Sequence, residues 1–231
     1  MNKFLKLLLG LIFLPSVSFF FYDFMGVLLI IVKNFRLTFS LIIGIVAYLI
    51  CHKYIYNFSR AYVFAHEVTH AIAAWCCGYK VSEIKVNKES GHTKVSNINT
   101  FVLLAPYCVP LYAVICILFF YITSLFWKDI LLYDKFFMAL LGFLMTLHLV
   151  HTYKSLTETE QSDVSLAGGG VFSFVLIGLA NLTLAVLLIK FLFPSLITAS
   201  SIFLEVVKQT ALFWRMFFVY IHDFIIWLKN L

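Results

Sequence analysis

The chain has 231 residues, of which 63% are hydrophobic and only 12% are charged, and its mean hydropathy is +0.99. Soluble domains carry about a quarter charged residues, so this composition excludes a soluble fold of this length and predicts an integral membrane protein. The formal charge of +6 comes from Lys and Arg residues that mostly punctuate apolar runs, a pattern that sets membrane orientation and argues against nucleic-acid binding.

Apolar runs long enough to cross a bilayer follow one another along most of the chain. A helical span needs about 20 mostly apolar residues. The candidate helices are residues 4–32, 36–57, 60–77, 100–126, 130–154, 170–193 and 196–230. We therefore predict an all-α polytopic membrane protein with about six transmembrane helices.

The first apolar run has two interpretations. Its basic start, its apolar stretch and the small residues Ser16-Val17-Ser18 are similar to a cleaved signal peptide. However, the apolar character resumes at Phe19 and continues to Val32. We therefore favour a retained first transmembrane segment.

The last apolar run carries a polar stripe on one helical face. The stripe consists of Glu205, Lys208, Arg215 and His222. Such a helix either lies in the membrane interface, which we favour, or spans the bilayer with its stripe turned towards protein.

Two polar stretches interrupt the apolar pattern. In the first, Ile84 and Val86 alternate with polar residues, Lys88-Glu89-Ser90-Gly91 supplies a turn, and a β-compatible run follows. This stretch predicts a β-hairpin over residues 81–96. The second, residues 155–170, is polar and then rich in glycine. Non-helical backbone near a membrane site has to be shielded by protein or line a wet cavity, so both stretches are candidates for a site.

The motif His66-Glu67-Val68-Thr69-His70 lies in a segment of good helical composition that ends at Gly78. Residues four apart share a helix face, so His66 and His70 can present two imidazoles to one ion, and Glu67 lies beside that face. In this H-E-x-x-H pattern the ion is Zn²⁺, and the glutamate takes a proton from the metal-bound water. These side chains are costly in a membrane helix unless they are paired or functional, so we predict a zinc hydrolase site with Glu67 as general base.

A catalytic zinc site needs a third protein ligand and leaves the fourth position to water. The residues that can supply this ligand are Asp163, Glu158, Glu160, His148 and His151. Asp163 lies beside the glycine-rich break, the two glutamates lie in a solvated run, and the two histidines share one helix face. Spacing alone does not choose among them.

These residues resemble those of the site-2-protease-like intramembrane metalloproteases of the M50 class, in particular the small bacterial M50B-like members. The shared features are His-Glu-x-x-His-Ala in an apolar helix, small residues after it, Gly78 at its end and the hairpin. Further on, Gln161-Ser162-Asp163 followed by Gly168-Gly169 resembles the region where the family supplies its third ligand, which implies Asp163. The better-known members place this aspartate in a Leu-Asp-Gly context after an Asn and prolines, whereas here Val164 follows it.

The resemblance implies a zinc metalloendopeptidase that cleaves a transmembrane or membrane-anchored protein, in the bacterial cytoplasmic membrane. The substrate has to be unwound locally, and an exposed hairpin edge can accept an extended segment. Ile84 and Val86 are therefore candidate substrate contacts. Asn181, a polar residue in an apolar run, is another, although an interhelical hydrogen bond is the commoner role for such a residue. Pro106 and Tyr107 interrupt the 100–126 segment and are candidates to shape the site.

This interpretation divides the chain into N-terminal transmembrane helices (1–57), a metalloprotease membrane core (58–193) and a C-terminal amphipathic or transmembrane helix (194–231). Two alternative functions stay open: a non-catalytic metal-binding membrane protein, such as an inactive relative, and an ion or proton transporter. A transporter would more naturally show paired broken helices in two similar halves, and the sequence has no such symmetry. The sequence indicates neither the identity of the substrate nor the oligomeric state.

Overall fold

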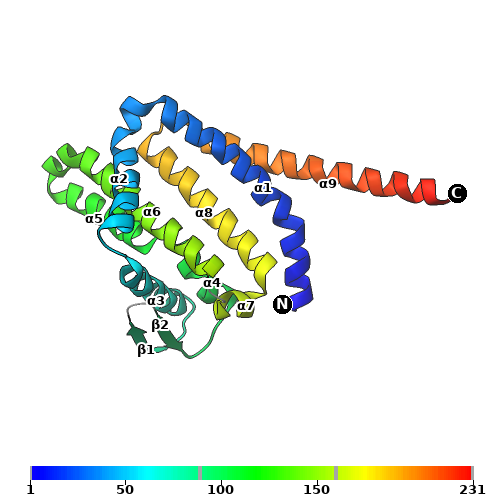
Figure 1. Ribbon diagram of the computed structural model, residues 1–231, viewed down its shortest axis with the longest axis horizontal. Coiled ribbons are helices and arrows are strands. Elements are labelled where there is room, and N and C mark those ends of the chain that lie inside the picture. The colour runs from blue at the N-terminus through cyan, green and yellow to red at the C-terminus, as the bar shows by residue number, and fades with distance from the viewer. Residues whose placement is uncertain (1, 88–89, 159–160, 230–231) are drawn as a thin grey trace. The chain divides into compact units, whose positions relative to one another are not determined.

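The computed structural model describes residues 2–87, 90–158 and 161–229, and these residues are largely helical (Figure 1). The helices follow the apolar runs of the sequence, and a two-stranded sheet follows the first polar stretch. In chain order the elements are α1 (Lys3–Lys33), α2 (Phe35–Tyr54), α3 (Ser59–Cys76), β1 (Val81–Val86), β2 (Gly91–Val95), α4 (Thr100–Cys108), α5 (Leu111–Phe126), the 3-10 helix η1 (Lys128–Tyr133), α6 (Asp134–Glu158), α7 (Ser162–Ala167), α8 (Gly170–Leu192) and α9 (Ala199–Lys229).

Five helical segments of the described chain are long and apolar enough to cross a membrane: α1, α2, η1 with α6, α8 and α9. The helices α4 and α5 together form a sixth candidate, bent by 71°. The predicted fold class, an all-α polytopic membrane protein of about six spans with a small hairpin, is confirmed. The helix α3 was expected among the spans and is not among them, because Arg60 and the polar residues of the His-Glu motif make it less apolar.

The bend between α4 and α5 lies at Val109 and Pro110. A proline disfavours the helical conformation for the residue before it, and Val109 is extended, with φ −105° and ψ 110°. The expectation that Pro106 and Tyr107 interrupt the segment is wrong, because α4 continues through both residues and ends at Cys108. Pro106 has no N–H, so it leaves the Val102 carbonyl without a helical donor, and this carbonyl accepts a hydrogen bond from His70 instead.

The chain divides into two compact units. One comprises Met1–Lys33 with Phe174–Leu231, and the other comprises Asn34–Ser173. The second unit contains the whole His-Glu motif, the hairpin and Asp163, so the candidate site is described within it. The division at residues 57 and 193 stays a prediction.

In the first unit, α1 packs against α9 through polar and aromatic contacts. The Thr210 hydroxyl donates a hydrogen bond to Ser16 Oγ at 3.2 Å, and Trp214 Nε1 donates to the Ile12 carbonyl at 3.1 Å. Polar side chains commonly join membrane helices in this way, because hydrocarbon offers them no other partner. The pairing explains how α1 and α9, at opposite ends of the chain, form part of one unit.

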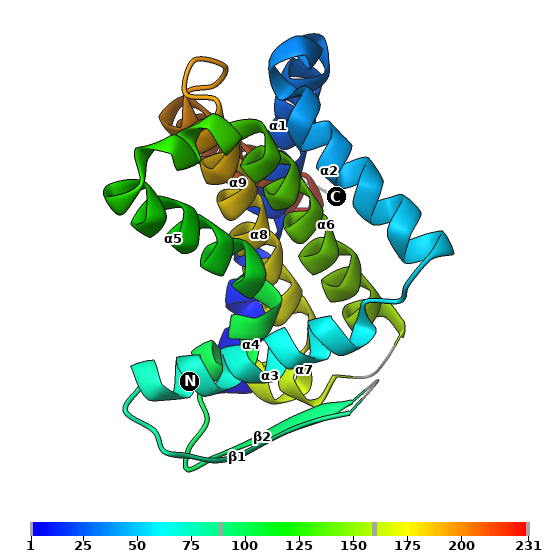
Figure 2. The ribbon, with the colours of Figure 1, turned by 90° about the vertical axis from the view of Figure 1, so that its left-hand side faces the viewer.

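In the second unit, α2 and α6 lie side by side (Figure 2). A Cβ at Gly44 would overlap the backbone carbonyl of Ala139, and a Cβ at Gly142 would overlap that of Leu41. The two glycines therefore let the helix backbones approach closely, as small residues do in many membrane helix pairs.

The end of α3 directs the chain into the hairpin. Gly78 has a positive φ of 75°, its N–H donates to the Trp75 carbonyl, and the next N–H, that of Tyr79, donates to the Ala74 carbonyl. These two bonds form a Schellman motif, for which glycine is the preferred residue. The prediction that the helix ends at Gly78 agrees with this geometry.

The predicted hairpin is present, and it lies against α3 (Figures 1 and 2). The strands β1 and β2 are antiparallel, with Ile84 opposite Thr93 and Val86 opposite Gly91. Of the predicted turn, Lys88 and Glu89 lie outside the described residues.

The polar stretch after α6 contains a short helix that the sequence did not predict. This helix, α7, is followed by Gly168 and Gly169, which have positive φ values of 151° and 93°. The Val164 carbonyl accepts hydrogen bonds from Gly169 N and from the Ser173 hydroxyl. The glycines thus allow a sharp turn that fixes α7, with Asp163 in its first turn.

Candidate metal centre

The helix α3 presents the His-Glu motif towards a polar cavity, while its small residues face the protein interior. Ala73 and Ala74 pack against Val102 and Ala105 of α4. Side chains this small let α4 approach α3 closely. His66 and His70, one helical turn apart, consequently face the region where α4 and α7 also arrive.

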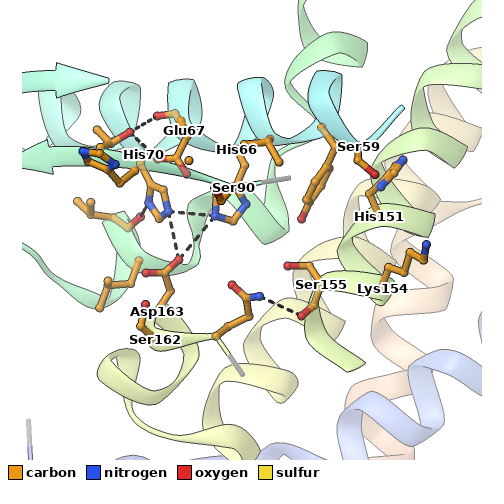
Figure 3. A pocket seen from close by; sticks show the side chains of 18 of the residues that line it. Ser59, His66, Glu67, His70, Ser90, His151, Lys154, Ser155, Ser162 and Asp163 are labelled. Atoms are coloured by element: carbon orange, nitrogen blue, oxygen red, sulfur yellow. Dashed lines mark hydrogen bonds and ion pairs between the residues drawn. The ribbon is translucent and has the colours of Figure 1, made fainter. Parts of the chain in front are cut away.

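Three potential ligand atoms converge at this place, and Figure 3 shows their side chains pointing towards one another. His66 Nε2 and His70 Nε2 lie 3.2 Å apart, and Asp163 Oδ2 lies 3.6 Å and 3.2 Å from them, respectively. Zinc at about 2.0–2.1 Å from tetrahedral ligands separates those ligands by about 3.3 Å. The spacing and the donor set of two imidazoles and one carboxylate therefore fit a zinc ion.

The electrostatics of the site keep Asp163 ionised. Burial acts to raise the pKa of Asp163, but hydrogen bonds from His66 and His70 outweigh it and hold this pKa well below its usual range. Burial acts to lower the pKa of His70, yet the hydrogen bond and charge of Asp163 raise it above its usual value. Each group thus stabilises the charged form of the other, and the ionised carboxylate is ready to neutralise part of a dication's charge.

The ring of His70 is oriented by the backbone of α4. Its Nδ1 donates a hydrogen bond of 2.8 Å to the Val102 carbonyl, which leaves Nε2 to face the ligand group. In an uninterrupted helix the N–H of residue 106 would donate to this carbonyl, but Pro106 has none. Metal-binding histidines are commonly oriented by such a bond from their second ring nitrogen.

Tyr107 connects α4 to the third ligand. Its side chain is fully buried, its ring meets His66 edge-on at 4.9 Å between centroids, and its hydroxyl lies 3.3 Å from Asp163 Oδ2. The same hydroxyl donates to Gln161 Oε1 at 2.9 Å. The prediction that Pro106 and Tyr107 shape the site is consistent with both contacts, although neither residue ends the helix.

Glu67 lies beside the ligand group and is only 5% exposed. Its side chain lines the same cavity as the three candidate ligands (Figure 3). Its carboxylate accepts a hydrogen bond from the Thr93 hydroxyl of β2. Thr93 was not predicted from the sequence as a site residue. Strand alternation, which places it on one face with Gly91 and Val95, was the available signal, but it does not reveal that this face meets Glu67.

The cavity has a volume of about 730 Å³. Besides the three candidate ligands, it is lined by residues of β2, by Ser155 near the end of α6 and by Gln161 just before α7. Ile84 and Val86 belong to β1 and are not among its lining residues. Asn181 belongs to the other unit, where its amide donates to the Ile177 carbonyl of its own helix. Substrate contact by these three residues stays a prediction.

The other candidate ligands do not join the group. His148, His151 and Glu158 lie on α6, and none of them belongs to the cluster of three within the described chain. Glu160 lies outside the described residues. Asp163 is thus the carboxylate that the fold brings to the two histidines.

The comparisons with known proteins agree with this geometry. The model of the family described as Peptidase M50B-like matches residues 38–211, about three quarters of the chain. No curated protein and no solved structure matches. The matched region includes α3, the hairpin and Asp163, and the chain belongs to the Peptidase M50B-like family.

Proposed function

We propose that this protein is a zinc-dependent peptidase that hydrolyses a peptide bond of a membrane-embedded or membrane-anchored protein. The observation that carries the proposal is the convergence of His66, His70 and Asp163 at zinc-ligand spacing beside Glu67. Membership in a family of peptidases supports hydrolysis over ion or proton transport. When bound, zinc supplies a Lewis acid that polarises a carbonyl and makes water nucleophilic at neutral pH.

Glu67 is the residue that moves protons in this proposal. An ionised carboxylate only accepts hydrogen bonds, so it can take the proton of the attacking water and then deliver that proton to the leaving nitrogen. His66 and His70 hold the ion as neutral imidazoles, and Asp163 holds it as a carboxylate that Tyr107 keeps oriented.

The hairpin is proposed to bind the substrate as an extended segment. Among the described residues, β2 pairs only with β1, so its other edge is available, and β2 lines the cavity. A locally unwound segment can add to such an edge by backbone hydrogen bonds. Ile84, Val86 and Asn181 remain the proposed side-chain contacts. By its resemblance to small bacterial members, we place the protein in a bacterial cytoplasmic membrane.

The proposal is tested by measuring metal content and proteolysis on the same purified proteins. The variants are Glu67→Gln, His66→Ala and Asp163→Ala, and the controls are His222→Ala and Asp129→Ala, which alter exposed residues. Each is reconstituted in liposomes with single-span reporter proteins. Bound zinc is measured by elemental analysis.

The wild type and both controls are expected to hold about one zinc ion per chain and to cleave a reporter. Glu67→Gln is expected to keep its zinc and lose about 10²–10⁴-fold in rate, because only the proton acceptor is missing. His66→Ala and Asp163→Ala are expected to lose both. Zinc without cleavage in every reporter would instead favour the non-catalytic alternative, and ion flux without cleavage would favour a transporter.

A further inference from the structure

One face of β2 is turned towards the side chain of Glu67. Gly91, Thr93 and Val95 alternate along this strand, and all three line the cavity that contains the Glu67 carboxylate. Strand alternation places the side chains of residues i and i+2 on the same face, so positions 91 and 93 can act on Glu67 together. Thr93 is hydrogen-bonded to Glu67, and Gly91 leaves room for its side chain.

Thr93 holds Glu67 at two atoms. Its hydroxyl lies 2.7 Å from Glu67 Oε2 and 3.0 Å from the Glu67 backbone carbonyl oxygen. Both atoms are acceptors, so the single hydroxyl proton is directed at Glu67 in either case. The 2.7 Å distance is in the range of charge-assisted hydrogen bonds to a carboxylate.

Because Gly91 has no side chain, the Glu67 carboxylate has room beside it. A Cβ at position 91 would lie 2.6 Å from Glu67 Cγ, 2.8 Å from Oε1 and 2.9 Å from Cδ. Distances below 3.0 Å require something to move. The absence of a side chain at Gly91 therefore permits the observed conformation of Glu67, while Thr93 selects it.

We propose that Thr93 and Gly91 are positioning residues that set the direction of the Glu67 carboxylate. The Thr93 hydroxyl engages Oε2, while Oε1 lies beside the space that a Cβ at position 91 would fill and remains the oxygen that takes the proton. A glutamate side chain has three rotatable bonds. Fixing its direction in advance avoids the loss of side-chain conformational entropy in each turnover. The inference rests on the proposed role of Glu67 as the base.

The position of these residues also connects the base Glu67 to β2, the strand proposed to pair with the substrate. The strand that holds Glu67 also lines the cavity, and among the described residues it pairs only with β1. A substrate segment that pairs with β2 would be placed on the element that aims the base. The hairpin and α3 would thus position the substrate and the base relative to each other.

The first test is kinetic. Thr93→Val removes the hydroxyl and keeps the shape, Thr93→Ser keeps the hydroxyl, and Thr157→Val is the control. Thr157 donates to the Tyr153 carbonyl within α6 and does not line the cavity. Cleavage of a single-span reporter in liposomes is followed with zinc content measured in parallel.

Thr93→Val is expected to lower kcat about ten- to hundredfold while KM and bound zinc stay near wild-type values, since outer partners of a site commonly contribute this much. Thr93→Ser is expected to restore kcat to within about threefold, and Thr157→Val to match the wild type. An unchanged kcat in Thr93→Val, or a loss that Thr93→Ser fails to restore, would overturn the proposal. A loss of zinc in Thr93→Val would also overturn it, because the residue would then maintain the site rather than aim the base.

The second test does not need proteolysis. Infrared difference spectra of zinc-free protein, wild type minus Glu67→Gln, isolate the Glu67 carboxylate band. This band is expected to shift in Thr93→Val and in Gly91→Ala, and to keep its frequency in Thr93→Ser and in Gly26→Ala, where a Cβ meets nothing within 4 Å. Shifted bands in a protein that cleaves no reporter would support the positioning and contradict the proposed function. Unshifted bands in Thr93→Val would contradict the positioning itself.

Discussion

A proline at position 106 leaves the Val102 carbonyl without a helical donor, and His70 Nδ1 takes that place at 2.8 Å. The arrangement lets one carbonyl orient a candidate metal ligand instead of bonding within its own helix. It also gives Pro106 a role that does not depend on breaking α4. The proline that bends the segment is Pro110, one turn later.

Pro106→Ala is therefore expected to weaken zinc binding without unfolding the protein. The alanine restores an N–H that competes with His70 for the Val102 carbonyl, and it relieves the helix of its proline. The expected loss is up to about tenfold in zinc affinity, at the low end for an outer partner of a ligand. Competition with a chromogenic chelator measures it, and Pro15→Ala in α1 is the matched control. Equal affinities in the two variants would show that the carbonyl orients His70 equally well when shared.

The residues of the site differ in how far they could be predicted. His66, Glu67 and His70 follow from a local pattern, because helix geometry alone places residues four apart on one face. Asp163 does not follow from spacing. Its position depends on where α6 ends and how the glycines after α7 turn the chain, so resemblance rather than geometry singled it out. Thr93 was missed because no local pattern shows which element a strand face meets.

At the scale of elements, the close packing of α2 and α6 depends on two glycines. The Cβ of a residue at Gly44 would overlap a backbone atom of α6, which cannot rotate away as a side chain can. The pair also carries the turn into α7, since α6 ends shortly before Asp163. Its spacing is therefore connected to the position of the third ligand.

Gly44→Ala is expected to destabilise the protein by about 1–3 kcal/mol, the usual cost of overpacking. Alanine is the better helix former by about 0.5–1 kcal/mol, but this gain is smaller than the cost of separating two helix backbones. Gly26→Ala in α1 has open space around its Cβ and is expected to show only the gain. Thermal unfolding in detergent compares the two variants. A Gly44→Ala protein as stable as Gly26→Ala would mean that the helices separate at little cost.

Hydropathy predicted most elements because a membrane span is a property of composition. The ends of α1, α2 and α8 lie within a few residues of the expected runs. The bend at Val109 and the short helix α7 were not predicted. A proline that bends a helix and one that a helix tolerates look alike in sequence, and a six-residue segment of mixed polarity before glycines resembles a loop. Tertiary partners decide both cases.

For the molecule as a whole, the long apolar helices indicate a protein integral to the membrane, with exposed apolar side chains over most of α1 and α9. Such surfaces are stable against lipid and not against water. We expect the full chain to stay in the membrane pellet after an alkaline carbonate wash and to enter solution only with detergent. Immunodetection of both fractions measures this, with a peripheral membrane protein as the control that the wash releases. Release of the chain by carbonate would contradict the assignment of its helices as spans.

The cavity beside the hairpin has a consequence for the supply of reactants. The proposed intramembrane hydrolysis would consume one water molecule for each bond, and a bilayer provides almost none. A volume of about 730 Å³ has room for a pool on the order of tens of water molecules, and hydroxyls and amides such as those of Ser155 and Gln161 can hydrate it. In the proposed function, the cavity would thus hold the water that the reaction consumes. The reactant that has to be delivered is then the peptide, and its unwinding is the step on which partners and membrane composition would act.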